Sequence, residues 1–252
     1  MLLLTGTWIA AEAQFGETIR TGRPGTAMGP FTVGKKVFQV QTGINIGRTN
    51  HASGYKTNDY RNVLVLRYGI RERIEVSGVL AYSSVHPTSI EAPELSKSGI
   101  SAAQIGVRFN IRDGKGSGPN IGIQSRLKLN TLSKDYEQKE LANITVLALS
   151  QKIGKSLVLI ANTGVSWSGN GDDAVALYAL NFRIPISRKI AMFVENFGTI
   201  KEGDLTSRFD TGLGYFVNND LKFDARIGLG SNRGVEDYFG EVGFSWRMVG
   251  NR

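Results

Sequence analysis

The sequence predicts an all-β fold, a transmembrane antiparallel up-and-down β-barrel of about twelve strands with short periplasmic turns and longer extracellular loops. Three observations support this prediction. Apolar and polar side chains alternate over segments of ten to thirteen residues, the connectors between segments alternate in length, and aromatic residues gather at the segment ends. A tilted strand needs about 9–11 residues to cross a bilayer, whereas strands of globular proteins average about 5–6 residues.

The bulk composition is compatible with such a barrel. Mean hydropathy is −0.14, as expected where lipid-facing and lumen-facing residues alternate. No run of about 18 apolar residues is present that would form a transmembrane helix. The chain has 31 Gly, 6 Pro and no Cys. The formal net charge is +8, but the basic residues are spread along the chain without the clusters that bind nucleic acid, so no nucleic-acid partner is expected.

The first residues are typical of an export signal. Residues 1–13 are mostly apolar, and Ala11-Glu12-Ala13 fits the small-x-small rule for cleavage, which leaves Gln14 as the first mature residue. The usual basic region is missing, so we expect this signal peptide to be truncated. A buried first strand or helix is the alternative. An exported chain with this strand pattern is expected in the bacterial outer membrane.

Residues 14–35 are predicted to be irregular because Arg23-Pro24-Gly25 and Met28-Gly29-Pro30 interrupt regular structure. The barrel is predicted to take residues 36–252. Its twelve segments lie near 36–48, 57–69, 73–84, 100–112, 119–131, 139–151, 156–168, 174–186, 189–200, 207–218, 220–231 and 237–248.

The alternation is clear in five segments. In the eleventh, for example, Leu221, Phe223 and Ile227 oppose Lys222, Asp224 and Arg226. A period of two over ten residues indicates a strand with two different faces. The sixth segment, around Ile144 to Ala148, is apolar on both faces, so its orientation is not assigned.

The connectors and the aromatic residues give the strands a direction. Short connectors lie near 69–72, 152–155, 187–188 and 218–219, and the connector at 112–119 on the same side is longer but Gly-rich. The other connectors are generally longer and polar and lie at 49–56, 85–99, 132–138, 169–173, 201–206 and 232–236. The short set is expected on the periplasmic side, together with both termini. Two aromatic girdles follow, an outer one of Tyr60, Tyr82, Trp167 and Tyr238 and an inner one of Phe38, Tyr68, Tyr215, Phe223 and Trp246. Core aromatics of a soluble fold are the alternative.

The polar faces define a candidate lumen lining that contains more cations than carboxylates. Its cations are Arg61, Arg67, Arg108, Arg126, Lys128, Arg183, Arg208, Lys222, Arg226 and Arg247, and its carboxylates are Glu75, Glu195, Asp210, Asp224 and Glu241. Either these residues form a paired network that holds a narrow barrel together, or they line a pore whose positive field favours anions. Residues 14–35 are a candidate plug of this lumen, in which Arg23, beside Pro24, is predicted to pair with Glu195 or Asp210.

No enzyme, cofactor or metal site is predicted. The two histidines, His51 and His86, fall in expected outer loops, and a Ser-His catalytic pair would need a third polar group to orient it. Metal-ligand spacing is absent, and Asp172-Asp173 is interpreted as a solvated turn rather than a calcium loop.

Several short motifs resemble a known family. They are Thr21-Gly22-Arg23-Pro24, Phe31 to Lys36, Phe38 to Gly43, Leu66 to Ile70 with Arg73 to Val76, and Glu195. This pattern resembles the outer-membrane family named for the meta-pathway of phenol degradation, whose members are often labelled transporters. Gly22, Lys35 and Gln41 depart from it, since the family usually has Asp, Pro and Glu there.

The resemblance implies a barrel for the passive passage of small molecules, either hydrophobic or anionic, with outer-membrane lipid and a small solute as partners. It implies no catalytic residues. One alternative is a non-conducting surface barrel that acts through its extracellular loops in adhesion or assembly. An outer-membrane barrel enzyme is less favoured. The sequence leaves the oligomeric state open.

Overall fold

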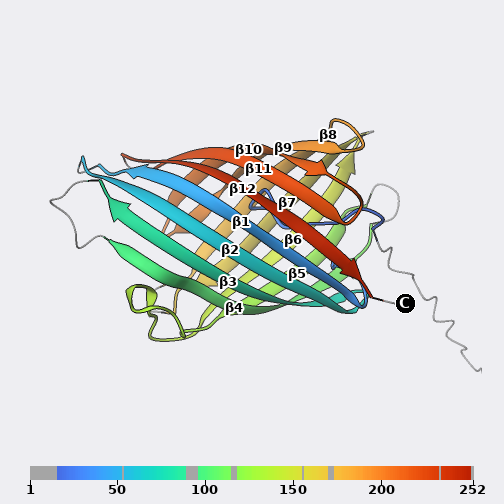
Figure 1. Cartoon of the computed structure of the whole chain (residues 1–252), viewed down its shortest axis with the longest axis horizontal. Helices are drawn as coiled ribbons and strands as arrows, with labels where there is room; N and C mark the ends of the chain where they lie inside the picture. The colour runs from blue at the N-terminus through green and yellow to red at the C-terminus, as the bar shows by residue number, and fades with distance from the viewer. Residues whose placement is uncertain are drawn as a thin grey trace, which may run out of the picture.

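A computed structural model describes residues 16–52, 54–88, 96–114, 118–154, 156–169, 173–232 and 234–250. These residues form a closed barrel of twelve tilted strands (Figure 1). The strands are β1 (Val37–Asn50), β2 (Lys56–Arg71), β3 (Ile74–Pro87), β4 (Lys97–Arg112), β5 (Asn120–Lys128), β6 (Ala142–Ile153), β7 (Leu157–Trp167), β8 (Val175–Pro185), β9 (Ile190–Lys201), β10 (Asp204–Phe216), β11 (Leu221–Asn232) and β12 (Val235–Val249). The expected signal peptide lies outside the described residues.

Each strand pairs antiparallel with its neighbours in sequence, and β1 pairs with β12 to close the barrel. The predicted fold class and strand number are therefore confirmed. No helix among the described residues is long and apolar enough to cross a membrane. A 3-10 turn, η2 (Lys134–Tyr136), lies between β5 and β6.

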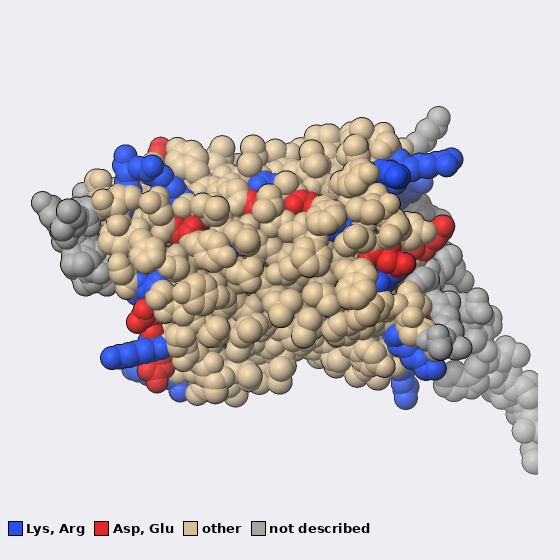
Figure 2. Space-filling model, viewed as in Figure 1, with Lys and Arg blue, Asp and Glu red and all other residues tan. Residues whose placement is uncertain are grey.

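The barrel has a polar interior and an apolar exterior. Gln39, Glu75 and Glu195 are among its most deeply buried large side chains, whereas Ile46 and Ile227 are 63% and 67% exposed. Figure 2 shows a broad, mainly uncharged belt between two ends that carry Lys, Arg, Asp and Glu. All nine aromatic residues expected in the girdles have the outward orientation, which suits a wall that faces lipid.

The pairing assigns the orientation of the sixth strand. Val146 and Ala148 of β6 are buried inside, and Leu147 faces outward. The inner face is apolar in this region because it adjoins a small apolar core, in which Ala27 packs with Ile160 of β7 and Ala179 of β8. Both faces of the wall are therefore apolar here, and the period of two is lost.

Two connectors differ from the prediction. The outer connections β9–β10 and β11–β12 are short. Strand β9 ends at Lys201 and β10 begins at Asp204, and β11 ends at Asn232 and β12 begins at Val235. The expected longer loops at 201–206 and 232–236 are wrong. Glu202 and Gly203 have φ values of 52° and 88°, the left-handed geometry of a two-residue hairpin, so the strands continue beyond the expected limits.

Candidate functional site

The first described residues, 16–36, run through the barrel and are called here the N-terminal strap. The strap enters at the end where the C-terminus lies (Figure 1), where Arg247 donates to the carbonyl of Gly16 at 2.7 Å and Ile19 N–H donates to Asn219 O at 2.7 Å. It leaves at the same end, where the Lys36 N–H donates to Gly69 O at 2.9 Å. The strap is therefore a loop inserted into the lumen from the periplasmic side.

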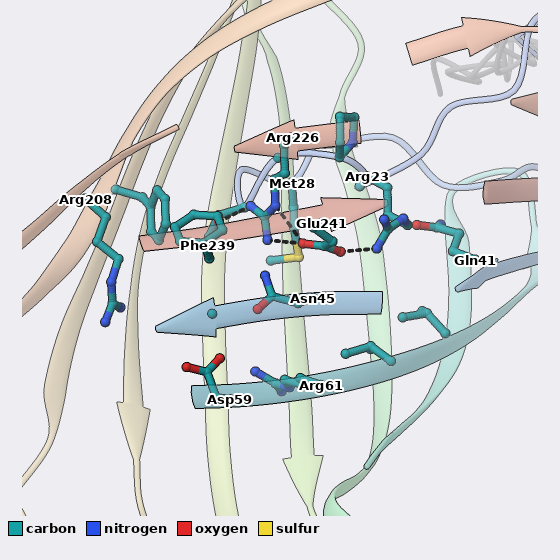
Figure 3. A pocket seen from close by; sticks show the side chains of 18 of the residues that line it. Arg23, Met28, Gln41, Asn45, Asp59, Arg61, Arg208, Arg226, Phe239 and Glu241 are labelled. Atoms are coloured by element: carbon teal, nitrogen blue, oxygen red, sulfur yellow. Dashed lines mark hydrogen bonds and ion pairs between the residues drawn. The ribbon is translucent and has the colours of Figure 1, made fainter. Parts of the chain in front are cut away.

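Arg23 anchors the ascending half of the strap. Its guanidinium donates to Asp224 of β11 at 2.8 Å and also pairs with Glu241 of β12. Arg226 donates to Glu241 at 2.6 Å (Figure 3) and to Asp210 of β10 at 2.8 Å, so it joins the two carboxylates. The predicted pairing of Arg23 with Glu195 or Asp210 is wrong, because closure of β12 onto β1 brings Glu241 nearer.

Two glycines make room for this guanidinium. Gly43 of β1 and Gly243 of β12 are paired across the seam of the barrel. A Cβ atom at either position would collide with the Arg23 guanidinium. The Arg23 guanidinium therefore lies against the β1–β12 seam at two paired positions that carry no side chain.

The top of the strap is held by backbone hydrogen bonds. The carboxylate of Glu195 accepts the N–H groups of Thr26 at 2.6 Å and Ala27 at 2.7 Å. Asn162 accepts from Met28 N–H at 2.7 Å and donates to Met28 O at 2.9 Å. Buried backbone groups need partners, and the strap has no regular secondary structure to supply them, so wall side chains do.

A second charged cluster holds the descending half. Arg67 of β2 pairs with Glu75 of β3 through two bonds of 2.7 Å, and both side chains are almost completely buried. Arg67 and Arg108 of β4 both donate to Phe31 O, at 3.3 Å and 3.0 Å. Glu75 also accepts the Val33 N–H at 2.9 Å. This ion pair therefore links the strap to the β2–β4 wall.

Arg20 completes the packing of the strap on itself. Its guanidinium lies over the ring of Phe31, 4.1 Å from the centroid. Burial lowers the pKa of Arg20, while Asp113 opposes this effect. The guanidinium nevertheless keeps its charge at neutral pH.

The strap leaves two cavities in the lumen. The outer chamber, about 570 Å³, lies on the extracellular side of the strap and is lined by Asn45, Asp59, Arg61, Arg126, Phe239 and others (Figure 3). The inner chamber, about 270 Å³, is lined by Arg20, Asn120, Lys152, Val158, Arg183 and others near the periplasmic end. Arg67 and Arg108 line both chambers.

All the lumen candidates chosen from the sequence lie on the inner face. The buried candidates are Glu75, Glu195, Asp210 and Asp224. The outer chamber is lined by Arg67, Arg108, Arg126, Arg226 and Glu241, and the inner chamber by Arg183. Lys128 lies on the same face of β5 as Arg126. Sequence reasoning missed three amides of the inner wall. Gln39 and Asn162 donate to carbonyl groups of the strap, and Asn181 donates to the carboxylate of Glu195, which holds the strap. The one feature of the sequence that could have identified them is an amide side chain at a strand position that points into the lumen.

The two histidines have different partners. His51 stacks on Tyr55, with ring centroids 4.1 Å apart. His86 lies on β3 rather than in a loop, and its Nε2 is 2.7 Å from the hydroxyl of Ser84 on the same strand. Within the part of the chain that the structure covers, no three His, Cys, Asp or Glu residues are grouped to hold a metal. Asp172 lies outside the described residues.

Solved structures with a similar fold include channels and porins. The COG4313 outer membrane channel from Pseudomonas putida F1 matches with a TM-score of 0.74 and 13% identity, over 87% of this chain and 98% of that chain. The KdgM porin in complex with disordered oligogalacturonate matches with a TM-score of 0.55 and 9% identity, over 81% and 98%. The CymD monoaromatic hydrocarbon channel matches with a TM-score of 0.50 and 11% identity, over 86% and 90%. These likenesses concern the fold.

No curated protein matches the sequence significantly. A family model described as "Putative MetA-pathway of phenol degradation" matches residues 21–248, which is nearly the whole barrel together with most of the strap. The chain belongs to this family of outer-membrane β-barrels, as its sequence motifs predicted.

Proposed function

We propose that this protein is an outer-membrane channel for the passive passage of small solutes and that the N-terminal strap forms its constriction. The observation that carries this proposal is the division of the lumen into an outer and an inner chamber that share Arg67 and Arg108 as lining. A solute that crosses the barrel would pass these two side chains beside the strap. The folds named above, which include channels and porins, support the same role.

The lining favours hydrophilic or anionic solutes over cations. The outer chamber carries Arg61, Arg67, Arg108 and Arg126 on the β2–β5 wall, and the inner chamber adds Arg20, Lys152 and Arg183. A pore lined mainly by cations attracts anions and repels cations. Charge pairing of the remaining lumen groups, such as Arg23 with Asp224, holds the strap rather than the solute.

The direct test compares the refolded full chain with a variant that lacks residues 16–35. Both are examined in planar bilayers, and a change in gel mobility upon boiling reports that each barrel has folded. We expect small conductance steps from the full chain and larger ones from the variant. Equal steps from both folded proteins would refute the constriction. Folded protein without conductance in either form would refute the channel and favour the surface barrel that acts through its loops.

A further inference from the structure

Charge is distributed unevenly around the lumen. The four carboxylates Glu195, Asp210, Asp224 and Glu241 lie on β9–β12, where the strap, Asn181 and Arg226 bind them. On β3 to β8, by contrast, Glu75 is the single carboxylate of the described residues, and Arg67 and Val33 already occupy it. On β2, Asp59 also lines the outer chamber. The β2–β5 wall therefore sets two carboxylates, Asp59 and Glu75, against five cations and keeps an excess of positive charge. These cations are Arg61, Arg67, Arg108, Arg126 and Lys128.

Three cations of this wall have no partner within it. Among the described residues, Arg61, Arg126 and Lys128 form no ion pair and donate no hydrogen bond, and the Arg126 Nε is buried without a partner. Lys128 is repelled by Arg61, and Arg126 is repelled by Arg67. Glu241 attracts Arg61 and Glu75 attracts Arg126, but Arg23 and Arg67 already pair with these two carboxylates. Arg126 is partly buried, and a buried charge without a partner is unfavourable unless a counter-charge or a polar ligand compensates it, whereas the Arg61 side chain is exposed and accessible to a ligand.

The same cavity has an apolar wall beside these cations. On β2 the inward positions run Arg61, Val63, Val65, Arg67, and all four line the outer chamber. Phe197 and Phe239 line it from the opposite side, in edge-to-face contact with centroids 6.5 Å apart. A chamber of about 570 Å³ has room for a small organic molecule between these surfaces.

We infer that the outer chamber is a binding site for a small organic carboxylate with an apolar body, whose carboxylate is bound by Arg126 and Arg61. The apolar body lies along Val63 and Val65. Guanidinium groups match a carboxylate in charge and in hydrogen-bond geometry. An inorganic anion would satisfy the cations but leave the valines without a partner. As a step in transport this site rests on the proposed channel function, whereas binding itself is measured without flux.

Equilibrium binding to the full-length refolded protein in detergent tests the site, with benzoate as the probe and isothermal titration calorimetry as the readout. Benzyl alcohol, which lacks the charge, and inorganic phosphate, which lacks the apolar body, are the comparison ligands. We expect benzoate to bind at least about tenfold more tightly than either comparison ligand. Benzyl alcohol loses a hydrogen bond to a charged group and phosphate loses the burial of an apolar ring, and each loss weakens binding by about this factor.

Two substitutions test the residues. Arg126→Gln should weaken benzoate binding by about tenfold or more, whereas Lys152→Gln, the same charge change in the inner chamber, should leave it unaltered. Val65→Thr keeps the shape of the side chain but adds a hydroxyl group, so it should weaken benzoate binding and leave phosphate binding unchanged. Gel mobility before and after boiling shows that each variant is folded.

The outcomes separate this inference from the channel proposal. A protein that conducts chloride but does not bind benzoate, or that binds it equally well with Arg126→Gln, overturns the site and leaves the channel intact. Equal affinity for phosphate and benzoate overturns the apolar half of the site. Binding that needs Arg126, in a protein that conducts nothing, supports the site and overturns the channel.

Discussion

The carboxylate of Glu195 accepts a hydrogen bond from the backbone N–H of Thr26 at 2.6 Å, although the two residues are 169 positions apart in the sequence. The side chain that receives this bond belongs to the barrel wall, and the group that donates it belongs to the top of the strap. This contact connects the top of the strap to a single carboxylate on β9 and leads to the first prediction.

Glu195→Gln should loosen the top of the strap. The substitution keeps the shape of the side chain but removes its charge and replaces one oxygen with an NH2 group, which cannot accept a hydrogen bond. One of the bonds from Thr26 and Ala27 is therefore lost, and a bond to a charged group is worth about 1.5–3 kcal/mol. We expect faster amide hydrogen exchange in peptides that cover 24–30, and a higher single-channel conductance. Asp59→Asn is the control, because it removes one negative charge from the outer chamber at a residue that does not hold the strap. Equal effects of the two variants would contradict this role of Glu195.

Gly43→Ala should displace Arg23 without unfolding the barrel. The new methyl group would occupy the place of the Arg23 guanidinium, which lies at the end of a flexible side chain and moves away from Asp224 and Glu241. We expect the strap to become sensitive to protease in detergent while the boiling-dependent gel shift is retained. Gly78→Ala is the matched control, since nothing lies within 4 Å of a Cβ atom at that position. Protection of the strap in both variants would argue against the anchor.

Arg126→Glu should reverse or abolish the preference for anions. It changes the charge of the β5 wall by two units in the outer chamber, where lumen charge acts directly on a passing ion. The reversal potential in a potassium chloride gradient measures this preference. Arg188→Glu makes the same change in the exposed β8–β9 turn and should alter the potential little. An unchanged potential for Arg126→Glu would place the path elsewhere.

Arg67→Met should destabilise the folded protein strongly. It leaves the Glu75 carboxylate buried with one cation fewer, and an uncompensated buried charge costs about 3–5 kcal/mol. The temperature at which the gel shift is lost should therefore fall. Adding Glu75→Gln should restore part of the loss, because the buried carboxylate that has lost its nearest cation is then replaced by a neutral group. If the double variant is as unstable as the sum of the two single ones, the pair is not coupled.

The strand pattern, the polarity of the two faces and the family are readable from the sequence, because each depends on residues close together in the chain. Lipid outside and polar groups inside impose a period of two on every strand, as Lys222 to Ile227 illustrate. The alternation of apolar and polar residues is absent on β6, where the inner face adjoins an apolar core rather than water. The predicted loop length is wrong at Glu202-Gly203, because composition does not distinguish a two-residue hairpin from a longer loop.

The tertiary structure alone decided which side chains meet. Arg23 lies beside Asp224 and Glu241 only because β12 closes onto β1, and Glu195 holds Thr26 only because the strap rises to the height of β9. A period of two tells which face a residue occupies but carries no information about its height or its neighbours across the lumen. The sequence by itself therefore determined the barrel and the charges on its inner wall, and the closure and register of the barrel determined their pairing.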